Sequence, residues 1–300
     1  MNVFIFPGQG SQYGSMAKKL YDKYNLAKDL YSQARNIIGK EIVDASFEAD
    51  EQLLMQTSYS QPAIFLYSFI LFSSLIDENK IKISDKDFYA GHSLGEITAL
   101  AASKAMNFSL ALKFVRFRGE AMAGVSVENG MMAALLKPDI DGCQKVFSEE
   151  FRGSLFIANL NSPSQISVSG LKNAFDSFNA KYQKQLFLKA IPLKVSAPFH
   201  CPFMEDAAKL VARELEKYTF NLENVVKVIS NKTAQPYPAD LNGVRKNISD
   251  AIINQVNWID SIKYLKSNNF SSYVEIGPKS ILIPFVKEID SEAMTQSFID

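Results

Sequence analysis

The sequence is poor in cysteine, histidine and tryptophan, and it has no excess of charge of either sign. Its 300 residues include 2 cysteines, 2 histidines and 1 tryptophan, and 32 basic residues balance 32 acidic ones. Two cysteines cannot form a disulfide framework, and no Cys or His spacing is typical of a metal site. A balanced charge gives no overall field that attracts nucleic acid or an anionic membrane surface. The composition therefore argues against a disulfide-rich, a metal-dependent and a nucleic-acid-binding protein.

Long hydrophobic runs are also absent. The longest one, "AIFLYSFILFSSLI" at 63–76, has 14 residues, whereas a membrane-spanning helix needs about 20. The N-terminal "MNVFIFPGQG" has no basic segment, and its apolar run is too short for a signal peptide. We therefore expect a cytoplasmic protein in which residues 63–76 form a buried core helix.

Helical and strand-like patterns alternate over most of the chain. Short apolar runs that predict buried strands lie at 3–6, in "DFYAGHS" at 87–93, in "VVKVIS" at 225–230 and in a final strand, "SYVEIGP", at 272–278. Helical patterns lie between them, at about 16–39, 61–75, 110–123 and 204–218. This alternation is typical of an α/β fold with a mostly parallel sheet.

The pattern changes between about residues 127 and 194. Strand-like "MMAALL", "LFIANL", "ISVSG" and "LFLKAIPL" occur with helical segments at 139–150 and 172–183, in the order β-α-β-β-α-β. That order suits a small ferredoxin-like unit. The sequence therefore predicts a large α/β subdomain formed by 1–126 and 195–300, interrupted by a small subdomain at 127–194.

The stretch "YAGHSLGEITAL" at 89–100 contains a Gly-x-Ser-x-Gly pattern between a predicted strand and a predicted helix. Gly91 and Gly95 bracket Ser93, and this context is the one that a nucleophile elbow requires. The serine would then stand at the N-terminus of a helix, whose N–H groups favour developing negative charge. The alternative is an ordinary turn framed by two glycines.

A nucleophilic serine needs a base, and the chain has two histidines to offer. His92 adjoins Ser93, and neighbouring side chains at the end of a strand point in opposite directions. His200 lies in "VSAPFHCPFM", after an apparent strand and near a subdomain boundary. His200 is therefore the candidate base, although a lone histidine is more often structural.

The loop "FPGQGSQ" at 6–12 follows the first predicted strand. It lacks the Gly-Lys-Ser/Thr of a P-loop and the spacing of a dinucleotide-binding loop, so phosphate binding is a weak interpretation. The alternative is that its backbone N–H groups supply half of an oxyanion hole.

Several motifs together resemble the malonyl-CoA:acyl carrier protein transacylase family, which includes fatty-acid enzymes and the acyltransferases of polyketide synthases. They are, in order, "GQGSQ", "YSQPA", "GHSLGE", "RGEAM", "ANLNSPSQISVSG", "SAPFH", "ISNKTAQPY" and "VEIGP", and they span essentially the whole chain. "ANLNSPSQ" and "ISNKTAQPY" are similar to discrete acyltransferases that serve polyketide synthases in trans. The resemblance implies an α/β-hydrolase-like large subdomain with an inserted ferredoxin-like small one.

The resemblance also implies roles for individual residues. Ser93 matches the family's nucleophile and His200 its base. The backbone N–H groups of Gln9 and Leu94 match the oxyanion hole. Arg118 matches the arginine that pairs with the malonyl carboxylate, and a guanidinium suits a carboxylate because it forms two parallel hydrogen bonds. On the sequence alone, Arg118 would be a surface charge of a helix.

Other expectations rest on the resemblance alone. Gln61 and Asn159 or Asn161 fall near substrate-binding positions. The substrate is malonyl-CoA, the partner is an acyl carrier protein, and we expect a monomer without a permanently bound cofactor or metal. The pathway is either fatty acid or polyketide synthesis, and tolerance of methylmalonyl stays open.

The chain departs from the family near Trp258. Ala251 stands where the family has a glutamine whose backbone carbonyl orients the catalytic histidine, and Gln255 stands where it has a proline. Ala251 could still supply a carbonyl. A carbonyl fixes the imidazole tautomer but stabilises an imidazolium less than a carboxylate does.

Three alternative functions compete with malonyl transfer. An acyl hydrolase of the same fold has no need of Arg118. An α/β-hydrolase esterase is disfavoured because no third, acidic member of a triad is identifiable and because "GQGSQ" is present. A non-catalytic docking module for carrier proteins is disfavoured by an intact Ser93 and His200.

Overall fold

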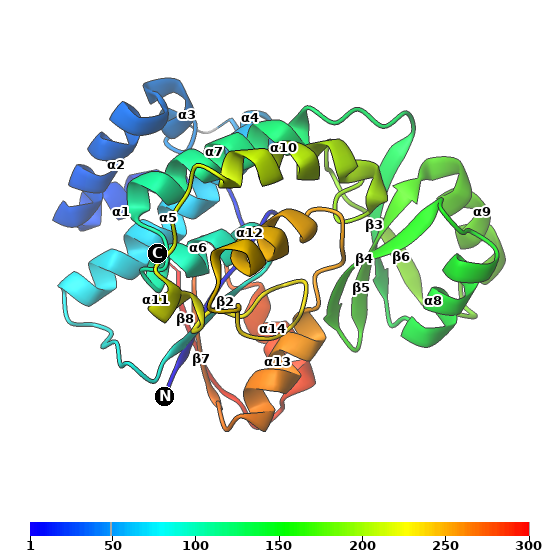
Figure 1. The fold of residues 1–300 in the computed structure, drawn as a ribbon. Coiled ribbons are helices and arrows are strands. Elements are labelled where there is room, and N and C mark those ends of the chain that lie inside the picture. The colour runs from blue at the N-terminus through cyan, green and yellow to red at the C-terminus, as the bar shows by residue number, and fades with distance from the viewer. Residues whose placement is uncertain (49, 300) are drawn as a thin grey trace.

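The computed structural model describes residues 1–48 and 50–299. Figure 1 shows a large part, in which helices surround a parallel sheet, and a smaller part with its own sheet and helices. The strands of the large sheet lie in the order β2-β1-β7-β8, and every neighbouring pair is parallel. They are β1 (Val3–Phe6), β2 (Phe88–Gly91), β7 (Ser272–Ile276) and β8 (Met294–Phe298).

Helices cover both faces of this sheet (Figure 1). Those before the small part are α1 (Met16–Lys23), α2 (Asn25–Ile38), α3 (Lys40–Asp44), α4 (Glu51–Met55), α5 (Thr57–Asp77), α6 (Leu94–Ala102) and α7 (Phe108–Ala123). Those after it are the short 3-10 helix η1 (Pro202–Met204), α10 (Glu205–Leu215), α11 (Leu222–Val225), α12 (Leu241–Asp250), α13 (Trp258–Ser267) and α14 (Leu282–Ile289).

Strand β1 lies at the centre of the core. Its sequence "VFIF" has no polar residue, because both faces of the strand are buried. Phe4 and Phe6 pack on one side, each with a ring centroid within 6 Å of that of Phe72 on α5. Val3 and Ile5 pack on the other side, with α13 and α14. The alternation of side chains along a strand thus joins two hydrophobic layers.

Helix α5 contains the longest apolar run and is the central helix of the larger core. By length and a mean hydropathy of 1.3 it could cross a membrane, but 78% of that apolar window is buried inside the protein. A core helix passes the same test of length and composition. The sequence-based prediction of a buried helix over 63–76 is therefore confirmed, with the observed helix extending to both sides.

The small part consists of β3 (Gly130–Leu136), α8 (Ile140–Glu149), β4 (Leu155–Ser162), β5 (Gln165–Leu171), α9 (Lys172–Tyr182) and β6 (Lys189–Pro192). Its sheet is antiparallel, in the order β4-β5-β3-β6, which is the arrangement of a ferredoxin-like unit. One face carries α8 and α9 over Phe147 and Phe178. Met132 on β3 points the other way, into the core of the large part. The subdomain boundaries at 126/127 and 194/195 stay a prediction.

Three predicted elements were wrong in detail. Residues 225–230, "VVKVIS", form no strand: after α11 only single-residue bridges pair Val228 with Tyr89 and Ile229 with Pro236, because a hydrogen-bonded turn begins at Ser230. The strand at 272–276 is not the last, since β8 follows it as a partly exposed edge strand that lacks a continuous apolar run. The helix predicted over 16–39 is interrupted at Tyr24, whose backbone is extended.

Candidate active site

The turn between β2 and α6 has the sharp geometry of a nucleophile elbow. Ser93 stands at the N-cap of α6 with φ 52° and ψ −105°, a conformation that is unfavourable for a residue with a side chain. A Cβ on Gly91 would lie 1.9 Å from the carbonyl carbon of Gly95, and a Cβ on Gly95 would lie 2.0 Å from the carbonyl oxygen of Phe6. Only glycine fits at both positions, so the pattern in the sequence reflects a steric requirement.

His200 reaches Ser93 from a segment 107 residues further along the chain. Its Nε2 lies 2.8 Å from the Ser93 Oγ, and its Nδ1 lies 2.8 Å from the carbonyl oxygen of Ala251 at the end of α12. A carbonyl can only accept, so Nδ1 carries the proton and Nε2 is the acceptor. The hydroxyl of Ser93 therefore donates to His200, which is the relation of a nucleophile to its base.

His200 is held in its neutral form. The side chain is buried, and burial together with the nearby Arg118 guanidinium lowers the pKa of His200 to about 3. Both causes disfavour the imidazolium, so the ring is neutral at pH 7 and free to accept a proton. The structure thus supplies a base without a carboxylate partner.

The depressed pKa of His200 leads to a prediction about pH dependence. The acid limb of kcat/KM reports the ionisation of the free enzyme. We expect kcat/KM for acyl transfer to stay level as the pH falls through 6.5, the ordinary histidine value, and to decline only at distinctly lower pH. A pH profile measured on enzyme that remains folded, as judged by circular dichroism, checks this. An inflection at 6.5 would mean that His200 is not the base or is not buried.

Arg118 on α7 lies beside the serine. It is 3% exposed; its Nη1 donates to Gln61 Oε1 at 2.7 Å and its Nη2 donates to Ser93 Oγ at 3.3 Å. Burial lowers the pKa of Arg118 to about 10, so the guanidinium is still charged at pH 7. Among the described residues, the hydrogen bonds of this guanidinium go to Gln61 and Ser93 and not to a carboxylate, although the charge of the nearby Glu96 partly opposes the fall in its pKa. A buried cation next to a nucleophile is suited to an anionic group on the substrate.

A cavity of about 300 Å³ opens in front of Ser93, His200 and Arg118. It lies in the cleft between the two sheets, since β3 and the 193–195 segment supply part of its wall. Its other lining side chains include Gln9, Gln61, Leu94, Met122, Met132, Asn159 and Phe199. A second cavity, of about 510 Å³, meets His200 from the side of α8 and the 253–257 segment. The smaller cavity is the one that contains the candidate nucleophile.

Two backbone N–H groups are available to an oxyanion in this cavity. Leu94 is the first residue of α6, so its N–H is not used within the helix, and the positive end of the helix dipole lies there. Gln9 follows β1 and borders the same cavity. The adjacent Gly8 lets this loop pack on the elbow, because a Cβ there would lie 2.4 Å from the His92 carbonyl oxygen. The oxyanion roles of Gln9 and Leu94 stay a prediction.

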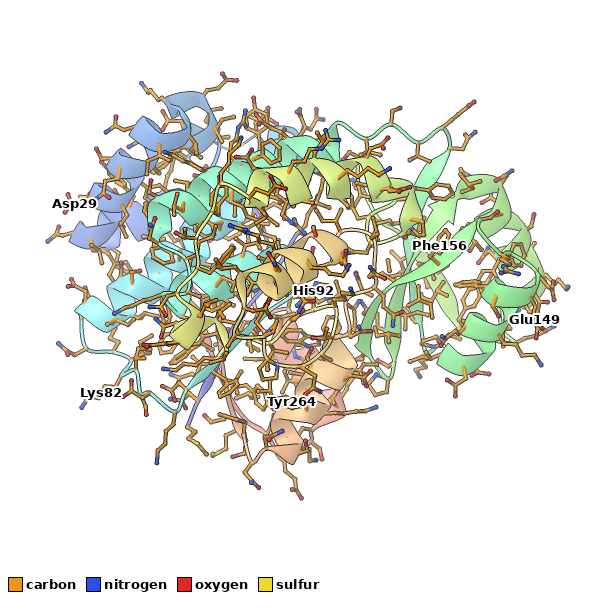
Figure 2. All side chains as sticks on the ribbon, in the orientation of Figure 1. Asp29, Lys82, His92, Glu149, Phe156 and Tyr264 are labelled. Atoms are coloured by element: carbon orange, nitrogen blue, oxygen red, sulfur yellow. The ribbon has the colours of Figure 1, made fainter. Side chains whose placement is uncertain are left out.

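The second histidine has a different environment. Figure 2 shows His92 in the middle of the molecule, whereas Asp29, Lys82 and Glu149 lie at its edges. The Nε2 of His92 lies 2.9 Å from Asn161 Oδ1, and among the described residues the ring nitrogen that contacts Ser93 Oγ belongs to His200. Burial lowers its pKa to about 4, so it is neutral too.

Of the two asparagines predicted near the substrate, Asn159 lines the cavity and Asn161 is bound to His92. Asn159 Oδ1 is buried and has no hydrogen-bond partner among the residues that the structure describes. Gln61 holds the guanidinium of Arg118, with its own Nε2 3.5 Å from Met122 Sδ. The structure therefore brings Gln61 and Asn159 to the candidate site, while their contacts with a substrate stay a prediction.

Sequence reasoning missed a buried polar group behind the serine. Asn231 Oδ1 accepts from the Ser93 N–H at 2.7 Å, and its Nδ2 donates to the Gly91 carbonyl at 2.6 Å. Glu96 and Tyr237 complete the group. All three lie inside "GHSLGE" and "ISNKTAQPY", but nothing in these motifs indicates a contact between them. In the described part of the chain, no cluster of three or more His, Cys, Asp or Glu side chains could hold a metal.

Comparison with known proteins identifies the family. Residues 3–292 match the acyl transferase domain family. The match covers nearly the whole chain, and the chain belongs to this family. It is therefore an acyltransferase.

Individual relatives have names that are more specific than the name of the family. The chain is 34% identical to the polyketide biosynthesis malonyl CoA-acyl carrier protein transacylase PksC of Bacillus subtilis, over 98% of this chain and 99% of that one. It is 32% identical to the malonyl CoA-acyl carrier protein transacylase of Bacillus subtilis, over 99% and 93%.

Solved structures agree on the fold. An acyl carrier protein S-malonyltransferase from Vibrio cholerae has a TM-score of 0.91 at 26% identity, covering 100% of this chain and 97% of that one. A malonyl-transacylase in complex with a type II PKS acyl-carrier protein has a TM-score of 0.92 at 26% identity, covering 100% and 96%. The predicted fold class and the predicted family are confirmed.

Proposed function

We propose that this protein transfers a malonyl group from malonyl-CoA to the phosphopantetheine thiol of an acyl carrier protein, through an ester on Ser93. The observation that carries the proposal is the buried Arg118 guanidinium 3.3 Å from Ser93 Oγ, which in turn lies 2.8 Å from His200 Nε2. An acyl group that ends in a carboxylate would satisfy this cation while its thioester carbon lies at the serine. The relatives named above support the same activity.

The first half of the proposed reaction loads the serine. His200 Nε2 takes the hydroxyl proton as Ser93 Oγ attacks the thioester carbonyl of malonyl-CoA. The N–H groups of Gln9 and Leu94 donate to the resulting oxyanion. When the tetrahedral intermediate collapses, the carbon–sulfur bond breaks, and the CoA sulfur leaves with the proton from His200. Malonyl-serine and free CoA thiol remain.

The second half of the proposed reaction transfers the malonyl group from Ser93 to the carrier protein. The phosphopantetheine thiol of the carrier protein gives its proton to His200 and attacks the ester carbonyl, and the same N–H groups hold the second oxyanion. Ser93 Oγ then leaves and recovers the proton. Throughout, the Nδ1–H of His200 donates to the Ala251 carbonyl, so the imidazole keeps one orientation.

Arg118 has a second consequence for the base. Its positive charge is one cause of the low pKa of His200. A malonyl carboxylate bound to Arg118 would offset that charge, so His200 would become more basic when the correct substrate is present. A neutral acyl group would leave the base as weak as in the free enzyme.

The names of the relatives bear on the pathway. PksC is named for polyketide biosynthesis, whereas the second Bacillus subtilis relative carries no pathway in its name. We propose fatty acid or polyketide synthesis, with a carrier protein as the partner. We further propose that the protein acts in the cytoplasm, as a monomer and without a permanently bound cofactor.

Incubation with radiolabelled malonyl-CoA, followed by a purified holo acyl carrier protein, tests the function. The proposal predicts that label first appears on the protein and then moves to the carrier protein. Prompt release of label as free malonate would instead identify a hydrolase of the same fold. Absence of label on protein, carrier and free malonate would identify a docking module.

A further inference from the structure

The strained elbow is held from behind by one side chain that belongs to a distant loop. Asn231 lies 138 residues after Ser93 and is 2% exposed. Its amide bridges two backbone groups on either side of His92: the N–H of Ser93 and the carbonyl of Gly91. These are the groups that the sharp turn removes from regular hydrogen bonding, because β2 ends at Gly91 and α6 begins after Ser93.

Only a side chain that both accepts and donates can bridge them. An amide offers a carbonyl oxygen for the Ser93 N–H and an NH2 for the Gly91 carbonyl, whereas a carboxylate can only accept and an alkyl group can do neither. The bridge also selects which N–H faces the substrate. With the N–H of Ser93 bound to Asn231, the free donor at the start of α6 is that of Leu94, on the side of the cavity.

Asn231 is itself fixed by a buried pair. Glu96, in the first turn of α6, accepts with one carboxyl oxygen both the backbone N–H of Asn231 at 2.8 Å and the hydroxyl of Tyr237 at 2.5 Å. All three residues are 2% exposed or less. Burial raises the pKa of Glu96 to about 7, and the two donors oppose that rise. The Glu96 carboxyl thus connects the loop that contains Asn231 to helix α6, which begins directly after Ser93.

Backbone hydrogen bonds also join the two ends of the loop at 230–235. The Ser230 N–H donates to the Gln235 carbonyl at 2.9 Å, and the Ala234 N–H donates to the Ser230 carbonyl at 2.8 Å. Before the loop, the Ile229 N–H donates to the carbonyl of Tyr89 on β2 at 2.9 Å. The loop is therefore hydrogen-bonded to both elements of the elbow, to β2 through Ile229 and to α6 through Asn231.

We propose that Asn231 is the positioning residue of the nucleophile: it holds Ser93 in the strained conformation that directs Oγ to His200, and it leaves the Leu94 N–H open to the oxyanion. Glu96 and Tyr237 keep Asn231 in place. The inference rests on the proposed function only in that Ser93 is the group that is acylated. Asn231 does not touch the reacting atoms, so its effect is on the rate of acylation and not on substrate binding.

Asn231→Ala is the first test. We expect the single-turnover rate of Ser93 acylation by malonyl-CoA and the steady-state kcat to fall about 100-fold, since a displacement of about 1 Å at a reacting group has this effect. KM should change little, because the contacts of Arg118 with the substrate remain. Asn224→Ala is the matched control. The side chain of this asparagine, seven residues before Asn231, donates to the Lys104 carbonyl at the surface. Its removal should leave the acylation rate unchanged.

Variants of Glu96 separate positioning from packing. Glu96→Gln keeps an oxygen acceptor of the same shape and should retain acylation near the wild-type rate, whereas Glu96→Leu should lose it to the same degree as Asn231→Ala. Should Asn231→Ala fail to fold, as judged by circular dichroism and melting temperature, Asn231→Asp takes its place. It keeps the shape and the acceptor but loses the donor to the Gly91 carbonyl, so slower acylation is again expected.

Acylation at the wild-type rate in folded Asn231→Ala or Asn231→Asp would overturn the inference, as would a rise in KM with an unchanged kcat. The wild-type protein provides the separate check on the function itself. If it accepts no malonyl, the proposed function fails; if it does, and the Asn231 variants accept malonyl as fast, only the positioning role fails.

Discussion

Replacing Ser93 with alanine is expected to abolish the acyl-enzyme and to lower malonyl transfer by at least about 10⁴-fold, the scale on which removal of a nucleophilic serine from such a site acts. The reason is that no other hydroxyl or thiol is shown within hydrogen-bond distance of His200 Nε2, whose partner in the described part of the chain is Ser93 Oγ at 2.8 Å. Single-turnover and steady-state rates with malonyl-CoA and holo carrier protein measure the effect.

The protein fold should survive this change. Alanine at position 93 removes one oxygen and leaves the hydrogen bond from the backbone N–H of this residue to Asn231 Oδ1 in place. Ser177→Ala on α9 is the control, because that hydroxyl is exposed and bonds only to the Asn173 carbonyl one turn earlier; it should transfer malonyl at the wild-type rate. Substantial transfer by a folded Ser93→Ala protein would remove Ser93 from the mechanism.

The second large effect is expected from Arg118→Ala. Malonyl transfer should fall by about 10²–10³-fold, because a malonyl carboxylate would be buried without its charged partner. Acetyl transfer from acetyl-CoA, which has no carboxylate to pair, should fall by much less. The ratio of kcat/KM for the two substrates, measured in parallel, gives the change in specificity directly.

Arg118→Ala should also alter the pH profile. The guanidinium is one of the causes that lower the pKa of His200, so its removal should raise that pKa and move the acid limb of kcat/KM to higher pH. Arg116→Ala is the matched control on the same helix: Arg116 pairs with Glu120 at 2.5 Å near the surface and should leave both substrates unaffected. Equal losses for malonyl and acetyl, with an unmoved acid limb, would contradict the role of Arg118.

The sequence predicted those parts of the site that depend on local pattern. Gly91, Ser93 and Gly95 are determined by the steric demands of one turn, and the paucity of histidine left His200 as the candidate base for Ser93. The parallel sheet and the ferredoxin-like unit followed from the order of apolar runs. These features can be predicted from a sequence because each depends either on residues that are close together in the chain or on a residue type that is rare in it.

Other features of the fold and of the candidate site could not be predicted from the sequence, for physical reasons. Asn231 is one of many asparagines, and its importance arises only when folding brings it to a turn 138 residues earlier. The segment 225–230 is as apolar as a strand because it is buried, yet it forms only isolated bridges. Strand β8 lies at an edge, where half-exposed polar side chains suffice, so it lacked the apolar run that marks a buried strand.

Ala251 shows that the identity of a side chain does not predict a contact made by the backbone. Its side chain departs from the family's glutamine, but the group that contacts His200 Nδ1 is the backbone carbonyl, at 2.8 Å. Any residue that preserves the end of α12 supplies this carbonyl. Substitution of the side chain therefore carries little information about a contact made by the main chain.

The central claim is that Ser93 carries the malonyl group between the two thiols. Its most direct test is mass spectrometry of the protein after incubation with malonyl-CoA alone, followed by peptide mapping and then by addition of holo acyl carrier protein. The account predicts one malonyl adduct per chain, located on the peptide at Ser93, that disappears as malonyl-carrier protein forms. An adduct on another residue, such as Cys201, or malonyl-carrier protein formed without any adduct on this chain, would contradict it.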